Sequence, residues 1–343
     1  MNMTFSSKFL GLLLLSLAVR AEEVKIYTWE EYISPELIDA YQKETGNSIE
    51  LVFFENELLR DEVINTGRGN IYDLIIVDSI NLQSMYRLGK FHSLASPAIT
   101  HRENLNHQAT VSCGEGGNPY MWGSMGIVYR NSQTDRAVTS WIELFNPRSE
   151  HKNKITIPLD DIDTIAAALL ALNYDPFTSD QQQLKEAFDL LQNVKPHILA
   201  MRNTASYTLE HQQQSEVNMG LAYSGEGYLI NEQMQVEDWS YVVPKEGTLI
   251  WHECFAAPKG HPIKQATIEF LSFINRPDIS AINAESVWYA TSNDAAIKLT
   301  SDEYQLDSEL FPDPEVLERS YLYREIDVEG MKLRNRMISV LNQ

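Results

Sequence analysis

Short apolar segments alternate with amphipathic ones near the start of the chain, and this alternation constrains the fold more than any other feature. Residues 24–29, 49–54 and 73–77 are mostly apolar and rich in β-branched and aromatic side chains, as strands are. Helical patterns follow them, and Ser34-Pro35 before the first has the residue types of a helix start. Fully apolar strands between helices are typical of a mainly parallel sheet with helices on both faces.

The same alternation resumes after Arg130. Strands are expected at 155–157 and 218–223, and helices at 161–173, 179–193, 226–235, 263–274 and 328–341. No repeat and no low-complexity linker separates the two sets. We therefore predict an α/β fold of two lobes, each a central, mainly parallel sheet flanked by helices, with hinge crossings between the lobes.

The N-terminus has the pattern of an export signal. Lys8 precedes the apolar run 9–19, and the small residues Val19 and Ala21 stand at the positions that a signal peptidase requires. The run is too short to span a bilayer stably. We predict a signal peptide over residues 1–21 and a periplasmic mature protein.

Charge and cysteine content narrow the function further. The 343 residues include 48 acidic and 27 basic side chains, a net charge of −21, which disfavours nucleic acid as a partner and favours cations. Solubility alone also accounts for such a charge. Cys113 and Cys254 are either a disulfide, which the periplasm permits, or two buried thiols.

Motifs for catalysis are absent. The chain contains no G-x-S-x-G, Walker A or H-E-x-x-H sequence. Asp160 and Asp161 leave a carboxylate-dependent hydrolase as a remote alternative. His252, Cys254 and His261 leave a zinc site as a weak alternative. We predict a protein that is not an enzyme, with no catalytic residues, no metal site and no cofactor.

Aromatic residues and carboxylates recur together at the expected ends of strands. In α/β sheets, ligands bind beyond the carboxyl ends of the strands. Carboxylates pair with ammonium groups, and aromatic faces hold cations and methylene chains, so the pattern favours an organic polycation. The clusters are Trp29-Glu30-Glu31-Tyr32, Tyr223-Ser224-Gly225-Glu226, Trp251-His252-Glu253, Trp288-Tyr289 and Asp160-Asp161.

With these residues the chain resembles the periplasmic spermidine/putrescine-binding proteins, type II solute-binding proteins of ABC importers. The resemblance covers essentially the whole mature chain. Its motifs are Ile26-Tyr27-Thr28-Trp29-Glu30-Glu31-Tyr32, Tyr72-Asp73-Leu74, Pro119-Tyr120-Met121-Trp122-Gly123, Val138-Thr139-Ser140-Trp141, Val217-Asn218-Met219-Gly220, Pro244-Lys245-Glu246-Gly247 and Asn275-Arg276-Pro277-Asp278.

The resemblance implies a ligand site at matching positions. Trp29, Tyr32, Tyr223, Trp251 and Tyr289 would form an aromatic box, with Tyr223 in place of a tryptophan. The implied polar ligands are Glu30, Glu31, Ser79, Asp161, Glu226 and Glu253. Spermidine binders have a tyrosine at the position of Asn81 and a glutamate at the position of Thr164. The length of the ligand and the recognition of its terminal groups are therefore left open.

The subgroup that the chain resembles most is that of the norspermidine sensor, which implies a receptor for norspermidine or spermidine. Such a receptor signals to an inner-membrane cyclic-di-GMP enzyme with GGDEF and EAL domains and controls biofilm formation. An ABC permease is the alternative partner. We expect a monomer with one lobe over residues 22–130 plus 256–300 and the other over 131–255 plus 301–343.

Overall fold

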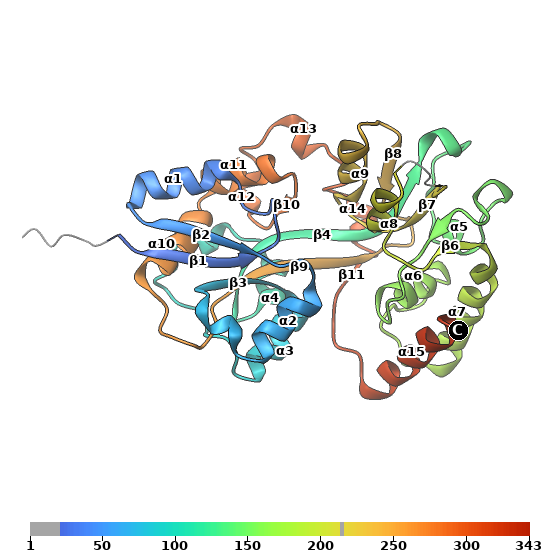
Figure 1. The fold of residues 1–343 in the computed structure, drawn as a ribbon, viewed down its shortest axis with the longest axis horizontal. Coiled ribbons are helices and arrows are strands. Elements are labelled where there is room, and N and C mark those ends of the chain that lie inside the picture. The colour runs from blue at the N-terminus through green and yellow to red at the C-terminus, as the bar shows by residue number, and fades with distance from the viewer. Residues whose placement is uncertain (1–20, 213–215) are drawn as a thin grey trace, which may run out of the picture.

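Two lobes lie side by side along the long axis of the molecule and share two long strands (Figure 1). This computed structural model describes residues 21–212 and 216–343. The expected signal peptide therefore lies outside the described residues, apart from Ala21. Within the described ranges, no helix is both long and apolar enough to cross a membrane.

The first lobe contains the N-terminal strands and the helices around them. Its strands are β1 (Glu23–Thr28), β2 (Ser48–Phe53), β3 (Leu74–Asp78) and β10 (Ala290–Thr291), and it shares β4 (Gly117–Arg130) and β9 (Leu249–Ala256). Its helices are α1 (Pro35–Thr45), α2 (Glu57–Asn65), α3 (Ser79–Arg87), α4 (His107–Cys113), α10 (Gln265–Ile274), α11 (Pro277–Val287), α12 (Asp294–Ile297) and α13 (Asp302–Gln305).

The second lobe contains the middle of the chain and the C-terminal helix. Its strands are β5 (Ile155–Thr156), β6 (Ile198–Ala200), β7 (Met219–Tyr223), β8 (Trp239–Val242) and β11 (Tyr321–Leu322). Its helices are α5 (Ile142–Phe145), α6 (Asp163–Ala171), α7 (Gln181–Val194), α8 (Thr204–Glu210), α9 (Glu226–Met234), α14 (Pro314–Leu317) and α15 (Val328–Leu341).

The strands join in the order β2-β1-β3-β9-β4-β7-β5-β6, with β8, β10 and β11 paired at the side. Pairing is parallel among β2, β1 and β3 and among β7, β5 and β6. It is antiparallel where β4 and β9 pass through the centre. The predicted α/β fold of two lobes is confirmed. The antiparallel strands at the centre of the sheet were not predicted.

Local signals place the first elements as expected. The Ser34 hydroxyl accepts a hydrogen bond from the Leu37 amide at the start of α1, and Gly46 ends that helix with a left-handed φ of 76°. Helix α6 begins at Asp163, two residues later than the expected start at Asp161. This later start decides which acid faces the protein interior.

Each lobe buries both faces of its sheet. In the first lobe, α1, α10 and α11 cover one face around Phe270, and α2, α3 and α4 cover the other around Ile75. In the second, α5, α6, α7 and α15 cover one face around Trp141, and α8 and α9 cover the other. The lobe boundaries at residues 130/131, 255/256 and 300/301 remain a prediction, because β4 and β9 pair with strands of both lobes.

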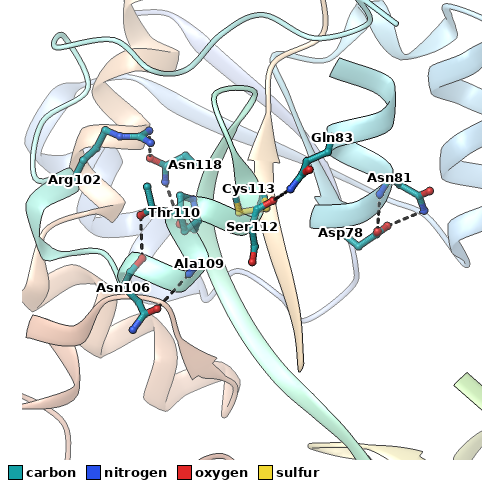
Figure 2. Close-up of a disulfide and its surroundings, with 12 residues drawn as sticks. Asp78, Asn81, Gln83, Arg102, Asn106, Ala109, Thr110, Ser112, Cys113 and Asn118 are labelled. Carbon is teal, nitrogen blue, oxygen red and sulfur yellow. Dashed lines mark hydrogen bonds between the residues drawn. A yellow bond between two sulfur atoms is a disulfide. The ribbon is translucent and has the colours of Figure 1, made fainter. Parts of the chain in front are cut away.

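A disulfide joins Cys113, at the end of α4, to Cys254, in β9 (Figure 2). Both residues are buried, and their Cα atoms are 5.9 Å apart. The bond closes a loop with a sequence separation of 141 residues. It therefore fixes the strand that carries Trp251 and Glu253 to the helices behind the sheet.

We expect Cys113→Ala/Cys254→Ala to lower the thermal midpoint by roughly 10 °C, because a crosslink over so long a loop contributes about 4 kcal/mol. Scanning calorimetry with and without a reductant measures this. The double variant is its own control, since a reductant should shift only the midpoint of the parent protein. An equal midpoint in both proteins would contradict a stabilising role for the bond.

Candidate functional site

On the first lobe, Trp29 and Glu253 meet at the end of the sheet. Trp29 follows β1, and its indole Nε1 donates to Glu253 Oε1 at 3.4 Å. The Trp29 ring packs edge-on against Phe54, with centroids 4.4 Å apart. The second carboxylate oxygen of Glu253, Oε2, is buried and has no hydrogen-bond partner.

The environment of Glu253 favours its neutral form. Burial raises its pKa to about 8, Asp78 and Glu57 add to the rise, and Arg60 opposes it. A carboxyl group that is buried without a full set of partners is costly to ionise. A cation placed at Oε2 would restore the charged form.

On the second lobe, the first turn of α6 presents a buried acid. Asp163 accepts hydrogen bonds from the hydroxyls of Tyr223 and Tyr323, the latter at 2.6 Å. Burial raises the pKa of Asp163 to about 7, Asp160 adds to the rise, and the tyrosines oppose it. Asp160 Oδ1 accepts from the backbone amides of Ile162 and Asp163, so it caps the helix.

Glu226 begins α9, directly after β7. One of its oxygens accepts from Asn203 Nδ2 at 2.8 Å, whereas the other, Oε2, is buried without a partner. Burial raises the pKa of Glu226 to about 7. The second lobe therefore also presents an incompletely paired carboxyl group.

Aromatic rings lie between these acids. Tyr289 packs edge-on against Tyr32, with centroids 5.0 Å apart, and its ring faces Gly225 of the second lobe. Burial raises the pKa of Tyr289 to about 12, and Glu226 and Glu253 are the largest charged contributors. Tyr289 thus lies within the electrostatic reach of acids from both lobes.

Trp251 lies at the crossing of the lobes. Any side chain at Gly123 would collide with its indole and with the hydroxyl of Ser224, so Trp251 packs over a glycine beside the end of β7. The indole Nε1 is buried and has no hydrogen-bond partner. A ligand acceptor or a bridging water would satisfy it.

Acids of the two lobes lie within electrostatic reach of one another. The pKa of Glu57, in α2, is raised by partial burial and by Asp78, and Asp160 of the second lobe contributes as well. Glu57 in turn raises the pKa of Asp163. Both lobes therefore contribute carboxylates to one negative region.

The structure brings together most, but not all, of the residues expected in the site. Contacts join Trp29 to Glu253, Tyr32 to Tyr289, Tyr289 to Gly225 beside Glu226, and Trp251 to Ser224 beside Tyr223; the ligand roles of these residues remain predictions. Ser79 is buried in the first turn of α3, beside Asp78. Glu30 and Glu31 are exposed, and Asp161 is partly exposed. Their ligand roles remain predictions.

Buried charged residues that were not expected include Arg60, Asp163 as the tyrosine-bound acid, and Glu309. Glu309 accepts hydrogen bonds from the amides of Gly225 and Gly227 and so caps α9. Arg60 lies one helical turn before the buried Ile64, so its apolar helix position was a usable signal. Nothing local in the sequence marks Glu309.

The two alternatives left by the sequence lose support. Asp160 Oδ1 accepts from two backbone amides at the start of α6, which is the structural role that acids at a helix start commonly have. The sulfur of Cys254 is bonded to Cys113, so this residue cannot supply a thiolate to zinc. Across residues 21–212 and 216–343, no group of three or more potential ligands is arranged to hold a metal ion.

Comparison with known proteins identifies the family. The profile of the bacterial extracellular solute-binding proteins matches residues 36–312. The chain belongs to this family. Its members bind solutes and are not enzymes, which confirms the prediction that this solute-binding protein has no catalytic activity.

Relatives of this solute-binding protein match most of its length. It is 30% identical to the norspermidine sensor of Vibrio cholerae, over 97% of this chain and 93% of that one. It is 28% identical to the spermidine/putrescine-binding periplasmic protein of Escherichia coli, over 85% and 83%. The crystal structure of a spermidine/putrescine ABC transporter substrate-binding protein from Streptococcus pneumoniae superposes with a TM-score of 0.83, at 26% identity over 94% and 99% of the chains.

We expect the ligand-free protein to lose stability as the pH rises from about 4.5 to about 8, and Glu253→Gln to reduce this loss. The folded-state pKa of Glu253 lies above its unfolded value, so the native state binds the extra proton in this window and unfolding becomes easier as that proton is lost. Glutamine mimics the neutral form. Thermal midpoints measured between pH 5 and pH 8 check this.

The exposed Glu237→Gln is the matched control and should keep the slope of the parent protein. A slope that Glu253→Gln leaves unchanged would show that Glu253 is already ionised at pH 5.

Proposed function

We propose that this protein is a periplasmic receptor for a polyamine, norspermidine or spermidine, that closes its lobes on the ligand. The observation that supports this most is the pair of buried carboxyl groups, Glu253 and Glu226, on opposite lobes, each with one unpartnered oxygen. Aromatic rings lie between them. The names of the relatives, which include norspermidine and spermidine/putrescine binders, support the same ligand class.

The chemistry of a polyamine fits this arrangement. Each ammonium group donates hydrogen bonds to a carboxylate, and such charge-assisted bonds in a partly buried site are strong. Trp29, Trp251 and Tyr289 offer faces for the methylene chain and for cation–π contact. Catalysis is not involved, and the ligand leaves the site unchanged.

Closure follows from differential affinity. Acids of the two lobes repel each other across an empty cleft, and a bound polycation converts this repulsion into attraction from both sides. A ligand that contacts both lobes only when they are closed shifts the equilibrium toward the closed form. In this structure, Arg87 of α3 pairs with Glu325 of the second lobe, and Tyr228 donates to Asp307 at 2.8 Å.

The proposed location is the periplasm, reached with the signal peptide over residues 1–21. The periplasmic names of the relatives support it, as does the disulfide. The cell would thereby display an acidic receptor to polyamines outside the inner membrane.

We propose that the closed form is read by an inner-membrane protein with GGDEF and EAL domains, which controls biofilm formation. The relative with 30% identity, named a norspermidine sensor, favours this role. Delivery of the polyamine to an ABC permease is the second candidate, favoured by the relative in Streptococcus pneumoniae that belongs to an ABC transporter.

We expect Trp251→Ala and Glu253→Gln each to weaken spermidine binding by at least about tenfold, because each removes a group that faces the ligand in a desolvated site. Titration calorimetry measures the affinities, and circular dichroism verifies the fold. Glu237→Gln, which changes an exposed acid, is the control and should bind like the parent. Unchanged affinity in both site variants would refute the proposed site.

To identify the partner, the gene can be deleted. We expect the deletion strain to lose the change in cellular cyclic-di-GMP that norspermidine causes, while the uptake of labelled spermidine continues. A receptor that only senses its ligand supplies none to the cytoplasm. Loss of uptake with an unchanged cyclic-di-GMP response would support the transport role instead.

A further inference from the structure

Arg60 is a fully buried cation beside the acids of the first lobe. Its Nη2 is 2.8 Å from Asp78 Oδ2, its Nε is 2.9 Å from Asp61 Oδ1, and its Nη1 is 3.9 Å from Glu57 Oε1. The side chain is 0% exposed. Nη1 is buried and makes no hydrogen bond.

The surroundings of this guanidinium are those expected for a ligand ammonium. Arg60 lies over the ring of Phe54, 5.7 Å from its centroid, and Phe54 packs against Trp29. Trp29 in turn donates to Glu253. Although burial by itself lowers the pKa of Arg60, Asp78 and Glu253 outweigh it and raise that pKa, so the side chain stays charged.

Most of the hydrogen-bonding capacity of Asp78 is used inside the protein. Its Oδ1 accepts from the Asn81 amide at 2.9 Å, and its Oδ2 accepts from Arg60 and, at 3.0 Å, from Asn81 Nδ2 (Figure 2 shows the Asp78–Asn81 contacts). Asp78 caps α3 with these bonds. The Asp78 carboxylate is therefore largely engaged by Arg60 and by the start of α3.

We propose that Arg60 is a built-in cation of the binding cleft, which takes up carboxylates that a further ammonium group would need and so makes the site select triamines over tetra-amines. This inference rests on the proposed polyamine-binding function. A tetra-amine such as spermine would bring one more ammonium group to a site in which Arg60 already engages two first-lobe carboxylates, those of Asp78 and Asp61. That group would be desolvated with fewer carboxylates to pair with, which is costly.

Calorimetry with spermidine and spermine tests the proposal through the affinity ratio of the two ligands in the parent, Arg60→Gln, Asp78→Asn and the double variant. Arg60→Gln frees Asp78 and should shift the ratio toward spermine by about tenfold, the effect of one added ion pair. Asp78→Asn keeps a residue that can cap α3 and leaves Arg60 in excess, so it should shift the ratio toward spermidine by several-fold.

Arg60→Gln/Asp78→Asn removes both charges, and its ratio should return to within about threefold of the parent. Arg60→Lys keeps the charge and should keep the parent's preference. Ratios that stay equal in Arg60→Gln and Asp78→Asn, with spermidine still bound, would overturn the role of Arg60 alone. A parent protein that binds neither amine would overturn the proposed function itself.

Discussion

Backbone pairing between β4 and β9 holds the molecule together, because these strands take part in both lobes. Gly117 to Ser124 of β4 pair with β9, and Met125 to Arg130 pair with β7 and β8 of the second lobe. A strand that changes partners in mid-course leaves its amides and carbonyls hydrogen-bonded on either side of the junction. The lobes are thus joined by ordered strands, and the residues at the junction keep fixed positions in the cleft.

The buried carboxyl groups of the site lower the stability of the ligand-free protein. Glu253 and Asp163 are buried and Glu226 is partly buried, all three have raised pKa values, and Glu253 and Glu226 lack a partner for one oxygen. A protein selected for stability alone would not retain such groups, and unsatisfied polar atoms of this kind concentrate at functional sites. Arg60 compensates part of this charge at one end.

Much of the fold could be predicted from local sequence. Apolar runs located β1, β2 and β3, and the Ser34 cap and Gly46 delimited α1, because these signals act within a few residues. The antiparallel centre could not be predicted, since it depends on pairing between β4 and β9, more than a hundred residues apart. The aromatic residues of the site were predicted from the resemblance to polyamine binders. Tyr289 packs against Tyr32 and Gly225, and Trp251 lies against Ser224.

The acids were harder to assign. In the run from Asp160 to Asp163, the side chain that points inward depends on where α6 begins, and that start lies two residues later than the pattern suggested. Partners from distant segments, such as Tyr323 on Asp163, carry no local signal at all. Which carboxyl is buried is therefore a property of tertiary structure.

At the junction of the lobes, the Ser124 carbonyl accepts a hydrogen bond from the Ser224 amide at 2.9 Å, and the hydroxyls of Ser124 and Tyr241 are hydrogen-bonded at 2.9 Å. Its neighbour Gly123 pairs with Trp251, and Met125 pairs with Tyr223. The junction of the lobes and the strands that carry Trp251 and Tyr223 are consequently one continuous piece of backbone. A change in the angle between the lobes therefore also changes how the rings of Trp251 and Tyr223 are placed relative to each other.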